Sequence, residues 1–555
     1  MSTTNTAATP APATGSAQGT VRRLIVYTIL FVLVTITAIG VAQLLERLLP
    51  VGTDLVRGSD GLALSLSFAL IGGPLGAVLW WVVWRRLADA AERASLAWGL
   101  YVAAMYTVSL IVATSALLGA ATAGVSGRWQ PGSLATGVVW AAVWAWHRWM
   151  WRHPRKGPIR LATVPAVAGS VYGLVVGVGG AVTALGSLFG AAIRGALGSA
   201  AALAGAPVWQ APVEALLWAL AGGAIWWWHW YRDATKDLRT GLSAVALVVV
   251  GVLGAGVLGL GGLGTALFVL LRLAFDPGDP PAEILGPLGT AIAAASVGAL
   301  VWWYHRGIAV RRSEATRRAG TLVMAAVGLA AAASGIGVIL NATLAALASP
   351  LAASDTRSLL LGGISALVVG GPVWWFSWRP ARSVPPTEVA GTGRRVYLVA
   401  VFGVSAVVAL VALLVVGYRL FEFALDSTSG ASLVDRIRAP LGLLVATALV
   451  FVYHFAVWRR DRAVIAAEGL APQRRIGRVI LVAAGDAAPL EQEIERVTGA
   501  SVTVWQRVAE TDPAAEVESE PDAAAVVAAL EGVTAKRVLV VAGPDGRAQV
   551  IRLAD

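Results

Sequence analysis

Twelve long apolar runs occupy most of this 555-residue chain. A helix needs about 20 mostly apolar residues to cross a bilayer, and each run is close to that length or longer. Inside lipid every backbone polar group must find its partner within the protein, so such runs fold as helices. Only 14% of the residues are charged, whereas soluble domains carry about 25%. The sequence therefore predicts an all-α polytopic membrane protein with about 12 transmembrane helices.

The runs form six pairs, each a helical hairpin. The first helices of the pairs are expected at approximately Leu24–Leu45, Ser95–Ala120, Leu161–Ile193, Leu238–Leu273, Ala319–Leu347 and Val396–Phe423. The second helices are expected at approximately Gly61–Trp84, Ser133–Trp151, Val213–Trp230, Ile284–Tyr304, Ser358–Trp378 and Ala439–Trp458. The run Leu238–Leu273 has 36 residues, or roughly 54 Å of helix, which requires tilt, projection beyond the bilayer, or a break in the GLGGLG stretch at Gly259.

Each second helix ends in aromatic residues followed by arginine, and four of the six ends also contain a histidine. The ends read WWVVWRR, WAWHRW, WWWHWYR, WWYHR, WWFSWR and VYHFAVWRR. When they are aligned, one column holds Val83, His147, His229, His305, Ser377 and His454. This recurrence indicates an internal hairpin repeat. The WW pairs at Trp80, Trp226 and Trp374 lie 146 and 148 residues apart, which predicts a larger unit of two hairpins present three times.

The distribution of charge predicts the orientation in the membrane. The side that holds the N-terminus and the ends of the second helices carries 27 Lys and Arg against 8 Asp and Glu, whereas the opposite loops carry 9 against 11. By the positive-inside rule, both termini are expected in the cytoplasm. Eighteen of the 23 tryptophans fall at the same border, which predicts an aromatic belt at the cytoplasmic headgroup level.

The residues at this border are the candidate site. We expect a contact with lipid headgroups, as an interfacial anchor or by binding anionic lipid, from His147, His229, His305, His454, Arg148, Arg232, Arg306, Trp227 and Trp303. A ring of imidazoles at one depth is also compatible with a proton or metal role. The sister repeats replace the histidine by Val83 and Ser377, which argues against catalysis, so no catalytic, cofactor or metal residues are assigned.

The interiors of the twelve runs hold almost no ionisable residues, although pumps and ion-coupled transporters usually need them there. Asn341 is the most notable polar residue inside a run, either as an interhelical hydrogen-bonding group or as a contact in a solute pathway. Glycines spaced by four, such as Gly169, Gly173 and Gly177, predict close helix packing, with a hinge or a glycine-lined path as the alternative.

Outside the hairpins we expect a disordered tail at 1–20, a basic linker at 463–475 and a cytoplasmic α/β domain at 476–555, the transmembrane repeats covering 21–462. The last segment reads as βαβαββ, with alternating strands, a helix near Pro489 and a terminal hairpin. It contains neither GxxxxGK nor GxGxxG, so we interpret it as an interaction domain for a cytoplasmic protein partner. The chain has no cysteine, which excludes disulfides and thiolate metal sites.

The apolar hairpin that ends in WWxHxxR, with basic residues before the next hairpin, resembles an uncharacterised bacterial membrane family known as domain of unknown function 5671. The resemblance covers roughly Arg22 to Arg462 in tandem copies, and that family's unit of about four helices agrees with the spacing of the WW pairs. It implies a bacterial inner-membrane protein and supplies no activity.

Three functions are open at this point. The leading hypothesis is a non-enzymatic scaffold or subunit of a membrane assembly, in contact with the bilayer and with a cytoplasmic partner. The alternative is a transporter or channel for a neutral or lipid-like solute, with a pathway between hairpins. An enzyme acting through the histidines is the third, and binding of nucleic acid is not expected, because juxtamembrane basic residues are usually topology and lipid signals.

Overall fold

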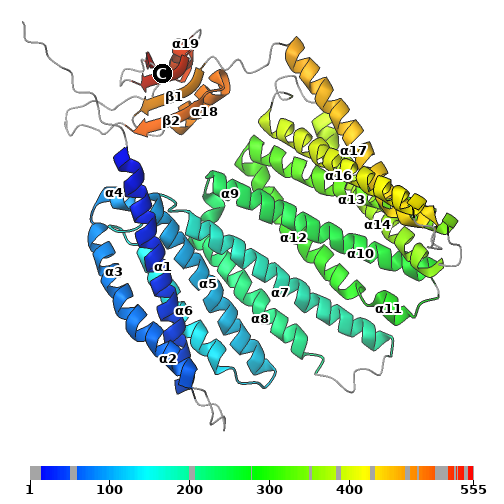
Figure 1. Cartoon of the computed structure of the whole chain (residues 1–555), viewed down its shortest axis with the longest axis horizontal. Coiled ribbons are helices and arrows are strands. Elements are labelled where there is room, and N and C mark those ends of the chain that lie inside the picture. The colour runs from blue at the N-terminus through cyan, green and yellow to red at the C-terminus, as the bar shows by residue number, and fades with distance from the viewer. Residues whose placement is uncertain are drawn as a thin grey trace, which may run out of the picture. The chain divides into compact units, whose positions relative to one another are not determined.

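The computed structural model describes residues 14–49, 59–198, 207–276, 278–348, 353–382, 389, 391–425, 432–468, 476–483, 487–506, 523–530, 533, 535–542 and 548–553 (Figure 1). The chain divides into two compact units. The first comprises Met1–Ser383 and Val399–His454, and the second comprises Val384–Leu398 and Phe455–Asp555. The first unit holds most of the helices, and the second holds the sheet.

Within the described residues the long helices form six hairpins, as the repeat predicts. The first three hairpins are α1 (Thr14–Leu48) with α2 (Ser59–Ser67), η1 (Phe68–Gly72) and α3 (Gly73–Arg86); α5 (Leu96–Val125) with α6 (Pro131–Trp151); and α7 (Val164–Ala196) with α8 (Gln210–Trp227) and η3 (Trp228–Arg232). The fourth and fifth are α9 (Gly241–Ala246), η5 (Leu247–Gly254) and α10 (Ala255–Phe275) with α12 (Leu288–Arg312); and α13 (Glu314–Ala348) with α14 (Ala353–Arg382). The sixth is α16 (Thr392–Leu425) with α17 (Leu433–Ala467), and short helices lie at α4 (Ala90–Arg93), η4 (Thr235–Asp237) and α11 (Pro281–Leu285).

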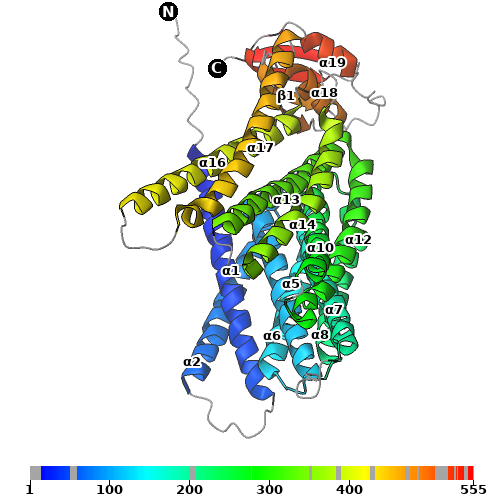
Figure 2. The same cartoon turned by 90° about the vertical axis from the view of Figure 1, so that its right-hand side faces the viewer.

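The helices begin where the sequence supplies a start signal. The Ser95 hydroxyl accepts a hydrogen bond from the backbone N–H of Trp98 and caps α5. Pro131 and Pro165 stand in the first turns of α6 and α7, where proline costs no backbone hydrogen bond. Successive hairpins then pack on one another in chain order, with α5 against α7 and α8, α7 against α12, and α10 against α14 (Figures 1 and 2).

Glycines bring the backbones of paired helices into direct contact. A Cβ added to Gly173 of α7 would lie 2.3 Å from the backbone nitrogen of Trp226, and one added to Gly180 would lie 2.3 Å from that of Ala219. The same closeness recurs between α13 and α14, where a Cβ on Gly328 would lie 2.4 Å from the Trp374 nitrogen. Since even a methyl group has no room, the glycine pattern serves close packing in these hairpins.

The structure removes one alternative for the fourth run, the break at GLGGLG, and moves two expected boundaries. The long fourth run is continuous helix through GLGGLG, and its irregularity is a π-helical stretch, η5, that begins at Leu247. Helix α1 begins at Thr14, inside the segment expected to be disordered, and α17 continues to Ala467, inside the expected linker. An existing helix extends at little cost into residues such as Ala17 and Gln18, because nucleation is the expensive step. Residues 1–13 and 469–475 lie outside the described residues.

Ten helices in the described residues are long and apolar enough to cross a membrane. Helices α6 and α8 are not among these ten, although each is packed in a hairpin like the others. Their sequences explain this, because α6 is dense in tryptophan and includes His147 and Arg148, while α8 is only 18 residues long and carries Glu214. The sequence thus predicts about 12 spans, and ten helices of the described residues have the length and hydropathy of a span.

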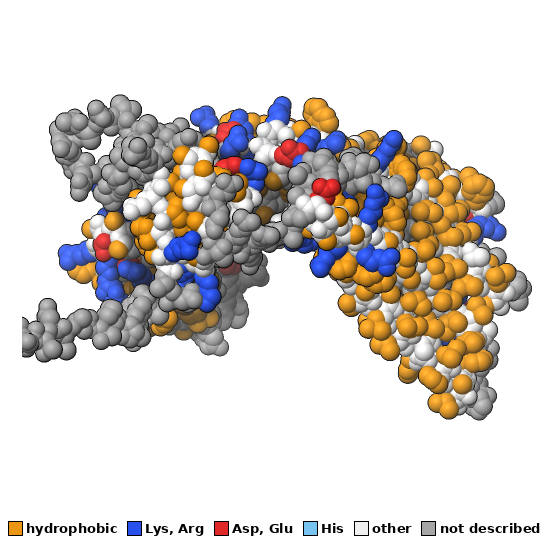
Figure 3. Space-filling model, turned by 90° about the horizontal axis from the view of Figure 1, so that it is seen from above, with side chains coloured by type: hydrophobic (Ala, Val, Ile, Leu, Met, Phe, Trp, Pro, Cys, Tyr) orange, Lys and Arg blue, Asp and Glu red, His pale blue; other side chains and the backbone are white. Residues whose placement is uncertain are grey.

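The surface of the helices is strongly apolar. Large hydrophobic side chains face outward along α16, including Val404 at 64% exposure and Leu414 at 65%. Seen from above, hydrophobic side chains form a broad field, and Lys and Arg side chains gather away from it (Figure 3). Such a surface exceeds what a soluble monomer normally exposes, and it fits contact with lipid.

The C-terminal segment has the expected βαβαββ order. It contains β1 (Ile476–Ala483), α18 (Ala488–Thr498), β2 (Ser501–Gln506), α19 (Ala523–Leu530), β3 (Ala535–Ala542) and β4 (Ala548–Leu553). The sheet order is β2-β1-β3-β4, with β1 parallel to β2 and β3, and β4 antiparallel to β3. Gly499 ends α18 at φ +64°, a conformation that suits glycine, and Leu481 and Val538 are among the fully buried core residues. On the exposed face of α18 a hydrogen bond from Arg496 lowers the pKa of the Glu493 carboxyl. The acidic loop at 507–522 lies outside the described residues.

Candidate functional site

The four recurring histidines are buried, each exposed by 2% or less. In every case Nδ1 lies 2.7–2.9 Å from the carbonyl oxygen four residues earlier, at Val143, Ile225, Val301 and Val450. A carbonyl only accepts, so Nδ1 carries the hydrogen, and Nε2 of the neutral ring is an acceptor. The Tyr101 hydroxyl donates to Nε2 of His147 at 3.1 Å, and the Tyr106 hydroxyl donates to Nε2 of His229 at 2.6 Å.

Aromatic side chains surround these histidines at the junctions between hairpins. Between the third and fourth hairpins, Trp230 Nε1 donates to the Tyr304 hydroxyl at 2.9 Å, and the His305 ring lies 5.5 Å from that of Trp230. Between the fifth and sixth hairpins, Trp378 Nε1 donates to the Tyr453 hydroxyl at 2.9 Å, and the His454 ring lies 5.6 Å from that of Trp378.

The two junctions therefore make the same hydrogen bond and the same ring contact, at nearly equal distances. Between the first and second hairpins, Trp80 packs edge to face on Trp146, at a ring distance of 6.0 Å, so a tryptophan stands where the other junctions have tyrosine. This recurrence gives a structural basis for the predicted larger unit of two hairpins.

The paired tryptophans divide between two environments. The second member of each pair is exposed, with Trp81 at 52%, Trp227 at 47%, Trp303 at 70% and Trp375 at 45%, while the first member packs toward the junction. Arg232 lies 5.9 Å from the Trp227 ring and Arg306 lies 5.0 Å from the Trp302 ring. Lipid contact therefore stays a prediction for the exposed Trp227, Trp303, Arg232 and Arg306, while the imidazoles lie inside the protein.

Arg148 belongs to a buried charged cluster rather than to the surface. Its guanidinium lies 3.3 Å from Asp233, and Arg152 also pairs with this carboxylate, which is 1% exposed. The Arg148 guanidinium also reaches the Tyr106 hydroxyl at 3.4 Å, and His229 Nε2 lies 3.9 Å from Asp233. The cluster ties α5, α6 and the turn after η3 together. Because it has two cations around one carboxylate, and both are hydrogen-bonded, a structural role accounts for it.

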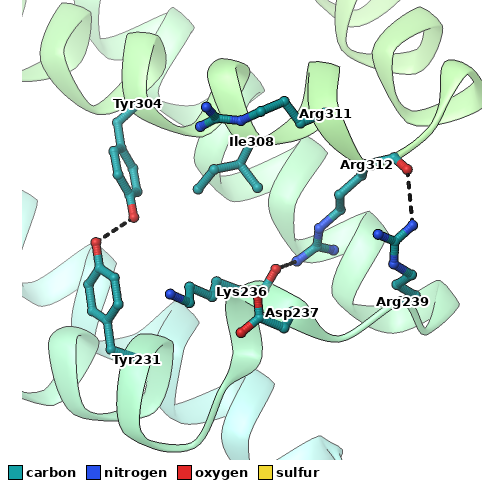
Figure 4. A pocket seen from close by; sticks show the side chains of 8 residues that line it. All are labelled: Tyr231, Lys236, Asp237, Arg239, Tyr304, Ile308, Arg311 and Arg312. Carbon is teal, nitrogen blue, oxygen red and sulfur yellow. Dashed lines mark hydrogen bonds between the residues drawn. The ribbon is translucent and has the colours of Figure 1, made fainter.

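A cavity of about 560 Å³ lies between the segment around η4 and the end of α12 (Figure 4). It is lined by Tyr231, Lys236, Asp237, Arg239, Tyr304, Ile308, Arg311 and Arg312. The two tyrosine hydroxyls lie 2.6 Å apart and point toward each other. Lys236 and Arg311 come from opposite sides of the cavity (Figure 4).

Asn341 takes part in a contact between helices. Its side-chain oxygen accepts a hydrogen bond from Arg438 of α17 at 3.0 Å. The backbones of α13 and α17 also approach closely there, since a Cβ on Gly442 would lie 2.3 Å from the carbonyl oxygen of Gly337. Asn341 does not line the basic cavity.

Sequence reasoning missed the groups that complete these sites. Tyr101, Tyr106 and Asp233 lie in helices or turns whose pattern gives no sign of a partner 46 to 123 residues away. Lys236 and Arg311 belong to the short basic runs KDLR and AVRR, which were counted only as topology signals. Among the described residues no group of three or more His, Asp or Glu side chains is placed to hold a metal ion.

The hairpins, the apolar surface and the ten long apolar helices define a multi-pass membrane protein with a small C-terminal α/β domain. The model of the family described as domain of unknown function 5671 matches residues 23–132 and 318–449. The two matches are consistent with tandem copies of this domain, which the repeats in the sequence predict. The matches begin 295 residues apart, at 23 and 318, which is close to two steps of the spacing between WW pairs. No curated protein and no solved structure matches the chain.

Proposed function

We propose that the protein is a non-enzymatic scaffold or subunit of a membrane assembly in the bacterial inner membrane, with both termini in the cytoplasm. The C-terminal domain at 476–555 is the part that binds a cytoplasmic protein partner. The observation that carries the proposal is the backbone-to-backbone packing of the helices, within a hairpin at Gly173 against Trp226 and between hairpins at Gly289 against Gly190. Helices in such contact leave no room between them for a solute, and they suit a rigid support.

The buried polar groups at the hairpin ends support the same function. The histidine Nδ1 atoms are held by backbone carbonyls, and the Trp230 and Trp378 nitrogens are held by tyrosine hydroxyls. Each of these bonds fixes one helix against its neighbour or itself, so the groups stabilise the bundle. The transport alternative requires a path at Asn341, where the bond from Arg438 and the contact at Gly442 favour a packed interface.

The test of the scaffold proposal is gentle purification of the full chain from native membranes beside a chain that ends at residue 475. We expect a stoichiometric cytoplasmic protein with the full chain and its loss from the shorter one. Both chains should reach the membrane fraction in equal amounts, which controls for folding. A full chain that purifies alone, with a bound neutral solute and measurable flux in liposomes, would establish the transport alternative instead.

The orientation rests on the excess of Lys and Arg at the ends of the second helices. Because the chain has no cysteine, single cysteines report the exposure of each side. Two positions are suitable for replacement by cysteine. Ser313 lies just beyond the end of α12, and Gly278 lies in the opposite loop, where an added side chain meets open space. A membrane-impermeant maleimide added to spheroplasts should label Gly278→Cys and spare Ser313→Cys until the cells are lysed. The reverse pattern would invert the proposed topology.

A further inference from the structure

We propose that the basic cavity beside η4 and α12 binds a ligand through a phosphate group. The cavity is lined by four cationic side chains, Lys236, Arg239, Arg311 and Arg312, against the single carboxylate of Asp237. A formal charge of +3 in one concave space is unfavourable unless an anion enters it, since like charges repel at short range. Phosphate is the anion whose charge and several oxygens match such a group of donors.

The walls of the cavity are fixed before any ligand arrives. Arg312 donates to the carbonyl oxygens of Thr235 at 3.2 Å and Lys236 at 2.8 Å, and to the Ser243 hydroxyl at 3.2 Å. Arg239 donates to the carbonyl oxygen of Arg312 at 3.3 Å, so the turn around η4 is tied to the end of α12 on both sides (Figure 4). A ligand therefore meets a preorganised site, which lowers the entropy lost on binding.

Lys236 and Arg311 are the side chains best placed to reach a ligand. The Lys236 ammonium lies 4.9 Å from the centre of the Tyr231 ring, over its face, and it extends into the cavity (Figure 4). Arg311 is exposed and reaches the same space from α12. Lys236 lies in the connection between the third and fourth hairpins, and Arg311 lies at the end of the fourth, so a phosphate between them would hold this connection against α12.

The tyrosine pair adds a neutral donor. Trp230 Nε1 donates to the Tyr304 oxygen at 2.9 Å, and the two tyrosine oxygens share one hydrogen bond at 2.6 Å. Two hydroxyl hydrogens are present, and only one lies between the two oxygens. The other is free of these bonds, and a hydroxyl that borders an anion site will donate to it.

The size of the cavity suits a phosphate ester. Its 560 Å³ falls within the roughly 300–1,000 Å³ of typical ligand sites, and Ile308 supplies an apolar wall. The ligand is either the headgroup of an anionic lipid or a soluble phosphate ester. The lipid source rests on the proposed function, because it needs this end of α12 at the headgroup level of the cytoplasmic leaflet.

The experiment measures binding to the full chain in nanodiscs by native mass spectrometry and calorimetry. The probes are a short-chain phosphatidylglycerol, soluble glycerol phosphate, and a diacylglycerol that lacks phosphate. The test variant is Lys236→Gln with Arg311→Gln. The matched control is Arg85→Gln with Arg86→Gln, which removes two exposed charges from the equivalent end of the first hairpin. Unchanged thermal unfolding verifies that each variant is folded.

We expect the test variant to lose about tenfold or more in affinity for phosphatidylglycerol, and the control to stay within about twofold of the parent chain. Loss for phosphatidylglycerol alone identifies a lipid headgroup, whereas a matching loss for glycerol phosphate identifies a soluble ester. Equal binding by test variant and parent, or binding of the diacylglycerol with the same dependence on Lys236 and Arg311, overturns the proposal. The absence of a cytoplasmic partner, or an inverted topology, would refute the proposed function without changing binding of glycerol phosphate.

Discussion

The packing of α7 on α8 makes a sharp prediction about two adjacent glycines. A Cβ on Gly222 would lie 2.1 Å from the backbone nitrogen of Gly177 and 2.6 Å from its Cα, whereas a Cβ on Gly223 meets nothing within 4 Å. Replacement of either glycine by alanine adds one methyl group to the same helix. The two variants thus share the change in helix propensity and differ only in the collision with α7.

The size of the effect follows from the distance. An ordinary contact of 3.4 Å requires the backbones at Gly222 and Gly177 to move apart by about 1.3 Å. A gap of 0.5–1 Å already removes about a quarter to a half of the dispersion attraction between facing atoms. Overpacking of this kind costs about 1–3 kcal/mol, so Gly222→Ala should be less stable than Gly223→Ala by about that free energy of unfolding.

The assay is equilibrium unfolding of the full chain in mixed micelles, followed by the near-ultraviolet signal of the tryptophans at the α8 end. Gly223→Ala should equal or slightly exceed the parent chain, because alanine favours the helix by roughly 1 kcal/mol. The reasoning is refuted if Gly222→Ala and Gly223→Ala have the same free energy of unfolding. That result would show that the two helices are separated by more than the glycines require.

Three further changes probe other contacts. Asp461→Asn should lower the free energy of unfolding by about 3 kcal/mol in denaturant titrations, because the buried Arg394 guanidinium holds both oxygens of that carboxylate at 2.6 and 3.1 Å; an unchanged value would show that the pair is solvated. Tyr304→Phe removes the acceptor of the Trp230 N–H and should cost about 1–3 kcal/mol, read in the same titrations, with a shift of the tryptophan emission as the local signature. Leu481→Ala empties a fully buried position of the sheet and should cost about 2–5 kcal/mol, seen as faster amide exchange in the C-terminal strands, while protection that stays at the level of the parent chain would contradict the buried core.

The hairpin order was predictable because a helix in lipid needs a long apolar run and must satisfy its own backbone hydrogen bonds. Apolar runs of about 20 residues with polar turns between them have few other solutions, so the six hairpins and the βαβαββ order of the C-terminal domain follow from pattern alone. The ends of elements were less predictable. Thr14 and Ala467 are helical because a helix propagates into neighbouring residues that a composition rule assigns to a tail or a linker.

The recurrence of the aromatic helix ends was visible in the sequence, whereas the contacts of their side chains were not. The aromatic ends recur at the spacing that the sequence shows, and the second tryptophan of each pair is exposed, while its contact with lipid stays a prediction. The burial of His147 and His229 was not predictable, because it depends on Tyr101 and Tyr106 of another helix and on the room left at Gly169. A histidine four residues before Asp233 likewise gives no sign that Arg148 completes the cluster.

The sequence by itself determined that this chain is a repeated set of apolar hairpins with a small α/β domain, because hydropathy and periodicity are properties of neighbouring residues. Only the tertiary structure decided what the repeated ends do. It turned the histidines and the first tryptophans inward to join successive hairpins, and it brought Lys236 and Arg311, 75 residues apart, into one basic cavity. Those outcomes depend on which helices become neighbours and on how closely their glycines let them approach. Neither can be predicted from the sequence of a single segment.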